Sequence, residues 1–185
     1  MTEPKPYRLG IVIGRFQAFH AGHEYMIEKA VALCEQVGVF IGSSQESGTV
    51  KNPFPYEVRA ELMKKVFGDR VQVFPLPDIG VGNNARWGDH VLETVKQCFG
   101  EAPDLLVSGK ELRRIEWFDS VAGLRVSELY VPKLIEISAT EMRGYFLNND
   151  VEAFRRFTNP VLWDDYGRLR ALVLAAQGNE ETESV

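Results

Sequence analysis

Two histidines three positions apart, with a glycine between them, are the residues of this chain best suited to chemistry. His20 and His23 flank Gly22, and they follow an apolar run at residues 9–13 that ends at Gly14. We expect a strand, a turn that Gly14 makes tight, and a helix whose first backbone N–H groups face an anion. Gly22 would leave room for a phosphate group. Neutral imidazoles donate hydrogen bonds there, and protonated ones add charge that stabilises leaving phosphate oxygens.

This pattern differs from two common phosphate-binding sequences. The chain contains neither G-x-G-x-x-G nor G-x-x-x-x-G-K-[ST], which disfavours an ordinary nicotinamide-dependent dehydrogenase and a P-loop kinase. The alternative for the pair is two surface histidines at a helix start. The glycine turn and the preceding Arg15 favour phosphate handling instead.

A second candidate element lies near the C-terminus, where residues 137–143 read I-S-A-T-E-M-R. Ser138 or Thr140 is suited to cap a following helix, and Glu141 stands three residues after Ser138, as in a capping box. A capping box alone is one interpretation. The functional interpretation adds N–H groups at the helix start and Arg143 one turn later, placed to bind a phosphate with two hydrogen bonds.

These two elements carry a resemblance to the H-x-G-H nucleotidyltransferases, which also have an I-S-x-T-x-x-R segment near the C-terminus. Within that superfamily the chain is similar to the nicotinamide mononucleotide adenylyltransferases of the archaeal type. The similarity covers roughly residues 8–157. Three further segments carry it, namely I-G-S-S-Q at 41–45, K-N-P-F at 51–54 followed by Arg59, and P-L-P-D-I at 75–79.

The resemblance implies transfer of AMP from ATP to nicotinamide mononucleotide, with Mg²⁺ bound to the ATP. It implies that His20, His23 and Arg143 are the catalytic residues and stabilise charge on the α-phosphate and the leaving pyrophosphate. We expect direct in-line attack without a covalent intermediate, because the acceptor phosphate is already an anion. The other expected ATP-binding residues are Gly14, Arg15, Phe16, Gln17, Gly22, Ser108, Gly109, Lys110, Ser138 and Thr140. Lys110 has an equally favoured alternative as a solvated lysine.

The expected acceptor site follows the segment at 75–79. By the resemblance, Trp87 stacks on the nicotinamide ring, and a cationic ring over an indole face is a favourable contact. Asp78 would add negative charge near the ring. The spacing from Asp78 to Trp87 is longer than the archaeal pattern, so Asn83 competes with Asn84 as the residue that reads the carboxamide. Arg59 is expected at the acceptor or its phosphate. The alternative for Trp87 is a core aromatic residue at a helix start.

The same residues are compatible with other functions. The same chemistry could serve nicotinate mononucleotide, phosphopantetheine, riboflavin phosphate or a cytidylyl donor, or the chain could be a non-catalytic nucleotide sensor. The net charge of −5 disfavours a nucleic-acid partner. The amide and acid forms of the mononucleotide are not distinguished. Archaeal relatives form symmetric oligomers, so the resemblance implies a homo-oligomer, but the sequence identifies no interface.

The elements that must position these residues are short apolar runs alternating with helix-period segments. This alternation predicts an α/β, Rossmann-like nucleotidyltransferase fold, with a mostly parallel five-stranded sheet, helices on both faces and a C-terminal helical segment. Ligands in such sheets bind beyond the carboxyl ends of the strands. Expected strands cover 9–13, 37–43, 71–74, 105–108 and 128–131. Expected helices cover 21–35, 55–67, 87–99, 140–147, 151–157 and 161–176.

The bulk composition fits one globular domain. The chain has 185 residues, 45% of them hydrophobic and 25% charged, and we expect a single domain over 1–177 followed by an acidic, frayed tail at 178–185. Cys34 and Cys98 are expected as reduced thiols in helices. No apolar run approaches the length of a membrane span, no residue spacing suggests a protein-held metal, and we expect a cytoplasmic protein without a membrane partner.

Overall fold

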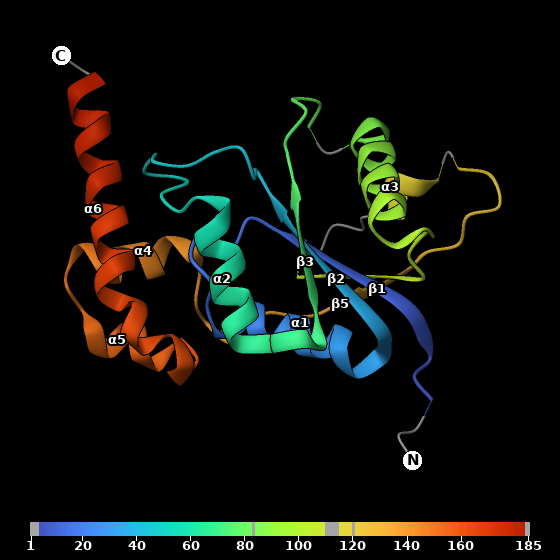
Figure 1. Cartoon of the computed structure of the whole chain (residues 1–185), viewed down its shortest axis with the longest axis horizontal. Coiled ribbons are helices and arrows are strands. Elements are labelled where there is room, and N and C mark those ends of the chain that lie inside the picture. Colours follow the sequence, from blue (N-terminus) through green and yellow to red (C-terminus); the bar gives the residue numbers. More distant parts are fainter. Residues whose placement is uncertain (1–3, 83, 110–114, 120, 184–185) are drawn as a thin grey trace.

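A five-stranded, fully parallel sheet organises the chain. The computed structural model describes residues 4–82, 84–109, 115–119 and 121–183, and its strands lie in the order β3-β2-β1-β4-β5 (Figure 1). The strands are β1 (Tyr7–Gly14), β2 (Cys34–Gly42), β3 (Gln72–Leu76), β4 (Leu105–Ser108) and β5 (Ser127–Tyr130). The expected α/β fold is confirmed.

Helices cover both faces of the sheet. The α-helices are α1 (Ala21–Leu33), α2 (Tyr56–Phe67), α3 (Ala85–Phe99), α4 (Ala139–Leu147), α5 (Val151–Arg156) and α6 (Tyr166–Glu183). The 3₁₀ turns are η1 (Gly68–Arg70), η2 (Ile115–Phe118) and η3 (Pro160–Asp165). Neighbouring residues of a strand point to opposite faces, so Val12 of β1 packs into a cluster with α1 and α2, while Ile11 packs into a second cluster with α3.

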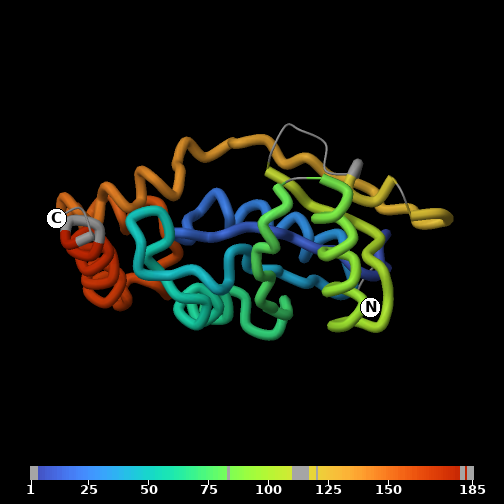
Figure 2. The backbone as a smooth tube through the Cα atoms, turned by 90° about the horizontal axis from the view of Figure 1, so that it is seen from above, coloured from blue at the N-terminus to red at the C-terminus, as the bar shows by residue number. Residues whose placement is uncertain are grey.

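The C-terminal helices extend the first of these two clusters. Phe146, Phe154 and Tyr166 pack with ring centroids 5.1–5.5 Å apart. The buried carboxylate of Asp165 accepts hydrogen bonds from Lys65 of α2 and from Arg168 of α6. Charged and aromatic contacts therefore hold the C-terminal helices against the sheet layer. Figure 2 shows the long connection from β5 to α4, in orange, running from the sheet to this helical segment.

Three details differ from the sequence expectations. Cys34 begins β2 rather than ending α1, because it pairs with Tyr7 and packs over Gly10, where a Cβ would lie 2.3 Å from its Sγ. Residues 160–165 form a 3₁₀ turn before α6. The helix α6 then continues to Glu183, through most of the segment expected to fray. In the described part of the chain, no helix is long and apolar enough to cross a membrane.

Candidate active site

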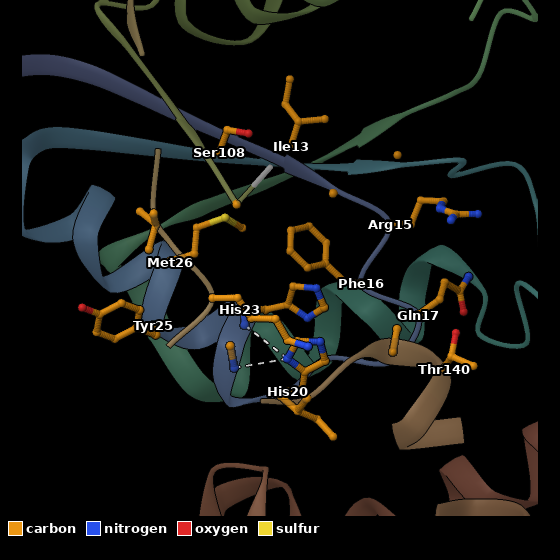
Figure 3. Close-up of a pocket in the computed structure, with 18 of the residues that line it drawn as sticks. Ile13, Arg15, Phe16, Gln17, His20, His23, Tyr25, Met26, Ser108 and Thr140 are labelled. Carbon is orange, nitrogen blue, oxygen red and sulfur yellow. Dashed lines mark hydrogen bonds between the residues drawn. The ribbon is translucent and has the colours of Figure 1, made fainter. Parts of the chain in front are cut away.

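A cavity of about 730 Å³ lies at the carboxyl edge of the sheet. Residues that follow all five strands line it, together with the first turns of α1, α3 and α4. The strand order reverses between β1 and β4, which is the place where ligands bind in open parallel sheets. Figure 3 shows the centre of the cavity, where the ring of His23 lies between those of Phe16 and His20. The cavity therefore brings both predicted motifs to one place.

His20 is the N-cap of α1. Its Nδ1 accepts hydrogen bonds from the backbone N–H groups of Gly22 (3.2 Å) and His23 (3.4 Å), drawn as dashed lines in Figure 3. The Ala21 N–H donates to the Phe157 carbonyl oxygen at 2.7 Å. The expectation that these N–H groups face an anion is therefore corrected, because the imidazole and a carbonyl occupy them. An unprotonated Nδ1 leaves the proton on Nε2, the hydrogen-bond donor that remains.

The two glycines of the motif make room for side chains. A Cβ on Gly22 would lie 3.1 Å from the His20 ring, and one on Gly14 would lie 2.9 Å from the ring of Phe16. Gly22 thus allows the capping imidazole to approach the helix, rather than leaving space for a phosphate directly. Phe16 itself has a positive φ of 53°, a conformation that non-glycine residues seldom adopt.

Both imidazoles are neutral at physiological pH. Their rings stack with centroids 3.7 Å apart, and Phe16 and Phe19 pack against His23. Burial, together with the charge of Lys133, lowers the pKa of His20 to about 4. Burial also lowers the pKa of His23 well below its usual value, and His20 adds to this effect. The Nδ1 atom of His23 is buried without a hydrogen-bond partner among the described residues.

Arg143 reaches the cavity from α4. Its guanidinium donates to the backbone carbonyl of Gln17 and, at 3.1 Å, to the hydroxyl of Thr140. Burial, with the nearby charge of Arg15, lowers its pKa from the usual value. All four of these residues line the cavity. The amide of Gln17 is itself paired with the backbone of Phe54, at 2.8 and 2.9 Å.

Ser138 forms the capping box that the sequence allowed. Its hydroxyl donates to the Glu141 carboxylate at 2.6 Å and accepts from the Glu141 N–H at 3.2 Å. The hydrogen bond from Ser138 is the main cause of a lowered pKa at Glu141. The hydroxyl of Ser138 is thus already engaged with its own helix, whereas Ala139 and Thr140 line the cavity.

Arg59 lies beneath the cavity rather than in it. Its side chain is 1% exposed and its guanidinium donates to four backbone carbonyls. Those of Arg15, Gly42 and Ser43 lie at 2.8–3.0 Å, and that of Glu46 at 3.4 Å. Burial is the main reason that its pKa is lowered to about 10. The expected contact with the acceptor is corrected, since these bonds hold together the loops that follow β1 and β2.

Asp78 is fixed at the β3 end of the cavity. Its carboxylate accepts from the Ser43 hydroxyl at 2.6 Å, and the Gln45 side chain pairs with both backbone groups of Asp78 at 3.0 and 3.2 Å. His90 of α3 lies 3.1 Å from the neighbouring carbonyl of Pro77. Asp78 is the one acidic residue among the described residues that line the cavity.

Two tryptophan side chains form an aromatic corner of the cavity. Trp87 of α3 and Trp117 of η2 both line the cavity, with centroids 6.4 Å apart and rings at 86°. Gly88 allows this approach, because a Cβ there would lie 1.9 Å from the carbonyl oxygen of Trp117. Asn84 caps α3 through its Oδ1, which accepts from the Trp87 N–H at 3.3 Å, and its amide nitrogen donates to the carbonyl of Val81. Both ends of the expected carboxamide reader are thus engaged.

The remaining predicted residues divide between the cavity and the part of the chain outside the described residues. Ser108 and Gly109 line the cavity at the end of β4. Asn83 and Lys110 lie outside the described residues. Sequence reasoning missed Trp117, Lys51 and Lys133 as cavity residues. Their segments carry no periodic or turn pattern that marks a site, although Lys51 stands inside one of the segments that carry the resemblance.

A metal would find few protein ligands here. Among the described residues, no three His, Cys, Asp or Glu side chains are grouped to hold an ion, and the two cavity imidazoles are occupied by a helix cap and by ring packing. Mg²⁺ in phosphate-transfer sites takes most of its ligands from phosphates and water. The donor set therefore fits a metal that enters with a phosphate ligand.

Comparison with known proteins agrees with this geometry. Of the curated relatives, a nicotinamide-nucleotide adenylyltransferase of Saccharolobus solfataricus is 38% identical over 80 residues, 40% of this chain and 46% of that protein. Another, of Thermococcus kodakarensis, is 28% identical over 84% of this chain and 76% of its own length. Alignments with several of these relatives thus span only about half of their length.

A solved structure supports the fold over nearly the whole chain. A bifunctional NMN adenylyltransferase/ADP ribose pyrophosphatase from Francisella tularensis, complexed with AMP and a manganese ion, superimposes with a TM-score of 0.74 at 22% identity. The superposition covers 96% of this chain and 54% of that one. The expected resemblance is confirmed. A sequence model described as cytidylyltransferase-like matches residues 11–144, and the chain belongs to the cytidylyltransferase-like family.

Proposed function

We propose that this chain transfers the adenylyl group of ATP to nicotinamide mononucleotide, releasing NAD and pyrophosphate. One observation carries the proposal. A single cavity combines the His20 and His23 turn and Arg143 with a corner made by Trp87 and Trp117. The first set suits a polyphosphate and the second suits a flat aromatic ring. The relatives named nicotinamide-nucleotide adenylyltransferase support the same pair of substrates.

The proposed reaction is an in-line displacement at the α-phosphorus of ATP. An oxygen of the mononucleotide phosphate forms a bond to that phosphorus, and the bond to the oxygen bridging the α- and β-phosphates breaks. Pyrophosphate leaves with the electron pair of the broken bond. The attacking phosphate is an anion near neutral pH, so no general base is required. Catalysis then consists of positioning and stabilisation of charge.

On the nucleotide side, the neutral imidazoles act as hydrogen-bond donors. Because Nδ1 of His20 caps α1, the Nε2–H of the same ring is the donor for a phosphate oxygen. The ring of His23 supports the His20 ring by stacking on it, with centroids 3.7 Å apart. Arg143 and Arg15 supply positive charge from opposite segments of the chain. Mg²⁺, bound to the ATP phosphates, would further neutralise the charge that develops on the pyrophosphate.

On the acceptor side, we propose that the pyridinium ring lies in the corner of Trp87 and Trp117. Cation–π contacts of this kind contribute about 0.5–2 kcal/mol. The carboxylate of Asp78, held by Ser43, faces the cavity at the same end of the sheet as the loop before α3. It would favour a cationic ring with a neutral carboxamide over one that carries a carboxylate.

The proposal is tested by pyrophosphate release from ATP with a panel of acceptors. We expect turnover with nicotinamide mononucleotide, a lower kcat/KM with nicotinate mononucleotide, and none above background with phosphopantetheine or riboflavin phosphate. Turnover with only phosphopantetheine or only riboflavin phosphate would refute nicotinamide mononucleotide as the acceptor and identify the other compound in its place. ATP binding without pyrophosphate release in any mixture would instead favour a nucleotide sensor and refute the enzymatic proposal.

A further inference from the structure

The segment between β5 and α4, residues 131–138, forms one wall of the cavity. At its start the N–H of Val131 donates to the carbonyl of Ser108 at 2.8 Å. Near its end, Cγ2 of Ile137 lies 3.8 Å from the position that a Cβ on Gly22 would occupy. The segment is therefore attached to the end of β4 and packed against the histidine turn, and Figure 2 shows it in orange on its way to α4.

Lys133 lies in this segment and lines the cavity. Its ammonium group is 3.4 Å from the carboxylate of Glu136, whose side chain is 84% exposed. Solvent-exposed pairs of this kind contribute little free energy, so a ligand phosphate can replace Glu136 at small cost. Arg143 differs, because the carbonyl of Gln17 and the hydroxyl of Thr140 already orient its guanidinium.

Lys133 and His20 line the same cavity, and the charge of Lys133 acts on the imidazole. After burial, the positive charge of Lys133 is the largest influence on the pKa of His20, and it exceeds the opposing influence of Glu141. The capping bond leaves Nε2 as the donor of that imidazole. Since both histidines are neutral, they can offer a phosphate hydrogen bonds but no full positive charge. A cation next to the Nε2–H would supply the missing charge.

We propose that Lys133 is a catalytic residue that binds the same phosphate oxygens as His20 and stabilises the leaving pyrophosphate. The catalytic role of Lys133 rests on the proposed function, whereas its contact with phosphate can be tested by binding alone. The arrangement divides two tasks between two side chains. Lys133 carries the charge, while His20, which is neutral mainly because it is buried, caps α1 through Nδ1 and offers Nε2–H as a donor.

The test compares Lys133→Met and Lys133→Arg with Lys64→Met, a change at an exposed lysine of α2. Affinities for ATP, inorganic pyrophosphate and adenosine are measured by calorimetry. We expect Lys133→Met to weaken both phosphate ligands roughly tenfold, as for the loss of one charge-assisted hydrogen bond. Adenosine affinity should not change, Lys133→Arg should recover most of the loss, and Lys64→Met should bind like the wild type.

A second measurement follows the His20 imidazole by NMR during a pH titration. Removing the charge in Lys133→Met should raise the pKa of His20, whereas Lys133→Arg should leave it at the wild-type value. Unfolding would raise this pKa as well, so the circular dichroism spectrum of Lys133→Met must match that of the wild type. Unchanged affinity for ATP and pyrophosphate in Lys133→Met would overturn the inference, as would a Lys133→Arg variant no better than Lys133→Met. A wild-type chain that binds these ligands through Lys133 but forms no NAD would refute the proposed function and leave the phosphate contact standing.

Discussion

Replacing His20 with asparagine separates the capping role of this residue from its role toward the nucleotide. Asparagine caps helices well, so its side-chain oxygen can still accept from the N–H groups of Gly22 and His23. The shorter side chain does not supply the Nε2–H donor. We expect the N-cap to survive in this variant, so that its free energy of unfolding falls only by the packing that the buried ring loses against His23. The kcat for NAD formation should fall roughly 100- to 1000-fold, because losing one donor to developing charge costs about 3–4 kcal/mol.

The matched variant His20→Ala removes both roles. We expect the same loss of kcat and an additional loss of about 0.5–2 kcal/mol in the free energy of unfolding, which is the usual cost of deleting an N-cap. Urea unfolding followed by circular dichroism gives the stabilities, and NAD formation coupled to alcohol dehydrogenase gives the rates. A wild-type kcat in His20→Asn would refute the donor role. Equal stabilities of the two variants would refute the capping argument.

His20, Gly88 and Trp87 each give one more prediction. Acidification from pH 6.5 to about 4 should lower the free energy of unfolding by about 3 kcal/mol through His20 alone. The reason is that the unfolded imidazole binds a proton in this range and the folded one does not. In urea titrations, the free energy of unfolding of His20→Asn should therefore change less steeply with pH than that of the wild type. Gly88→Ala should destabilise the fold by about 3 kcal/mol or more, since its Cβ would lie 1.9 Å from a backbone oxygen of Trp117, whereas Gly144→Ala, in open space on α4, should melt no lower than the wild type. Trp87→Ala should raise KM for nicotinamide mononucleotide about 2- to 30-fold and spare KM for ATP; equal losses in steady-state kinetics would mark Trp87 as a packing residue.

Much of the architecture could be predicted from the sequence because its elements have strong local patterns. Apolar runs such as residues 9–13 form the buried strands, and the alternation with helices determines a parallel sheet. The carboxyl edge of such a sheet must then bring His20, Arg143 and Trp87 to one cavity, as it does. The ends of elements were less predictable where hydrogen bonding between strands determines them. Cys34, for example, belongs to β2 because it pairs with β1 in the parallel sheet.

The sequence could not reveal which groups satisfy one another. The residue pattern does not tell whether the N–H groups of α1 donate hydrogen bonds to a ligand or to the His20 ring, since both can accept them. Arg59 has the residue type of a phosphate ligand, and only the fold places four carbonyl oxygens around it. Asn84 did offer a signal, because asparagine three residues before Trp87 at a helix start is a typical N-cap.

In the proposed reaction, one cavity joins AMP from ATP to nicotinamide mononucleotide. Phosphorus NMR of the wild-type chain mixed with ATP, Mg²⁺ and nicotinamide mononucleotide tests it most directly, because substrates and products are all observed together. We predict that the pyrophosphate signal of NAD and the signal of inorganic pyrophosphate grow at equal rates, while the mononucleotide phosphate disappears at that same rate. Consumption of ATP with the mononucleotide signal unchanged, or no change in any signal, would contradict the account.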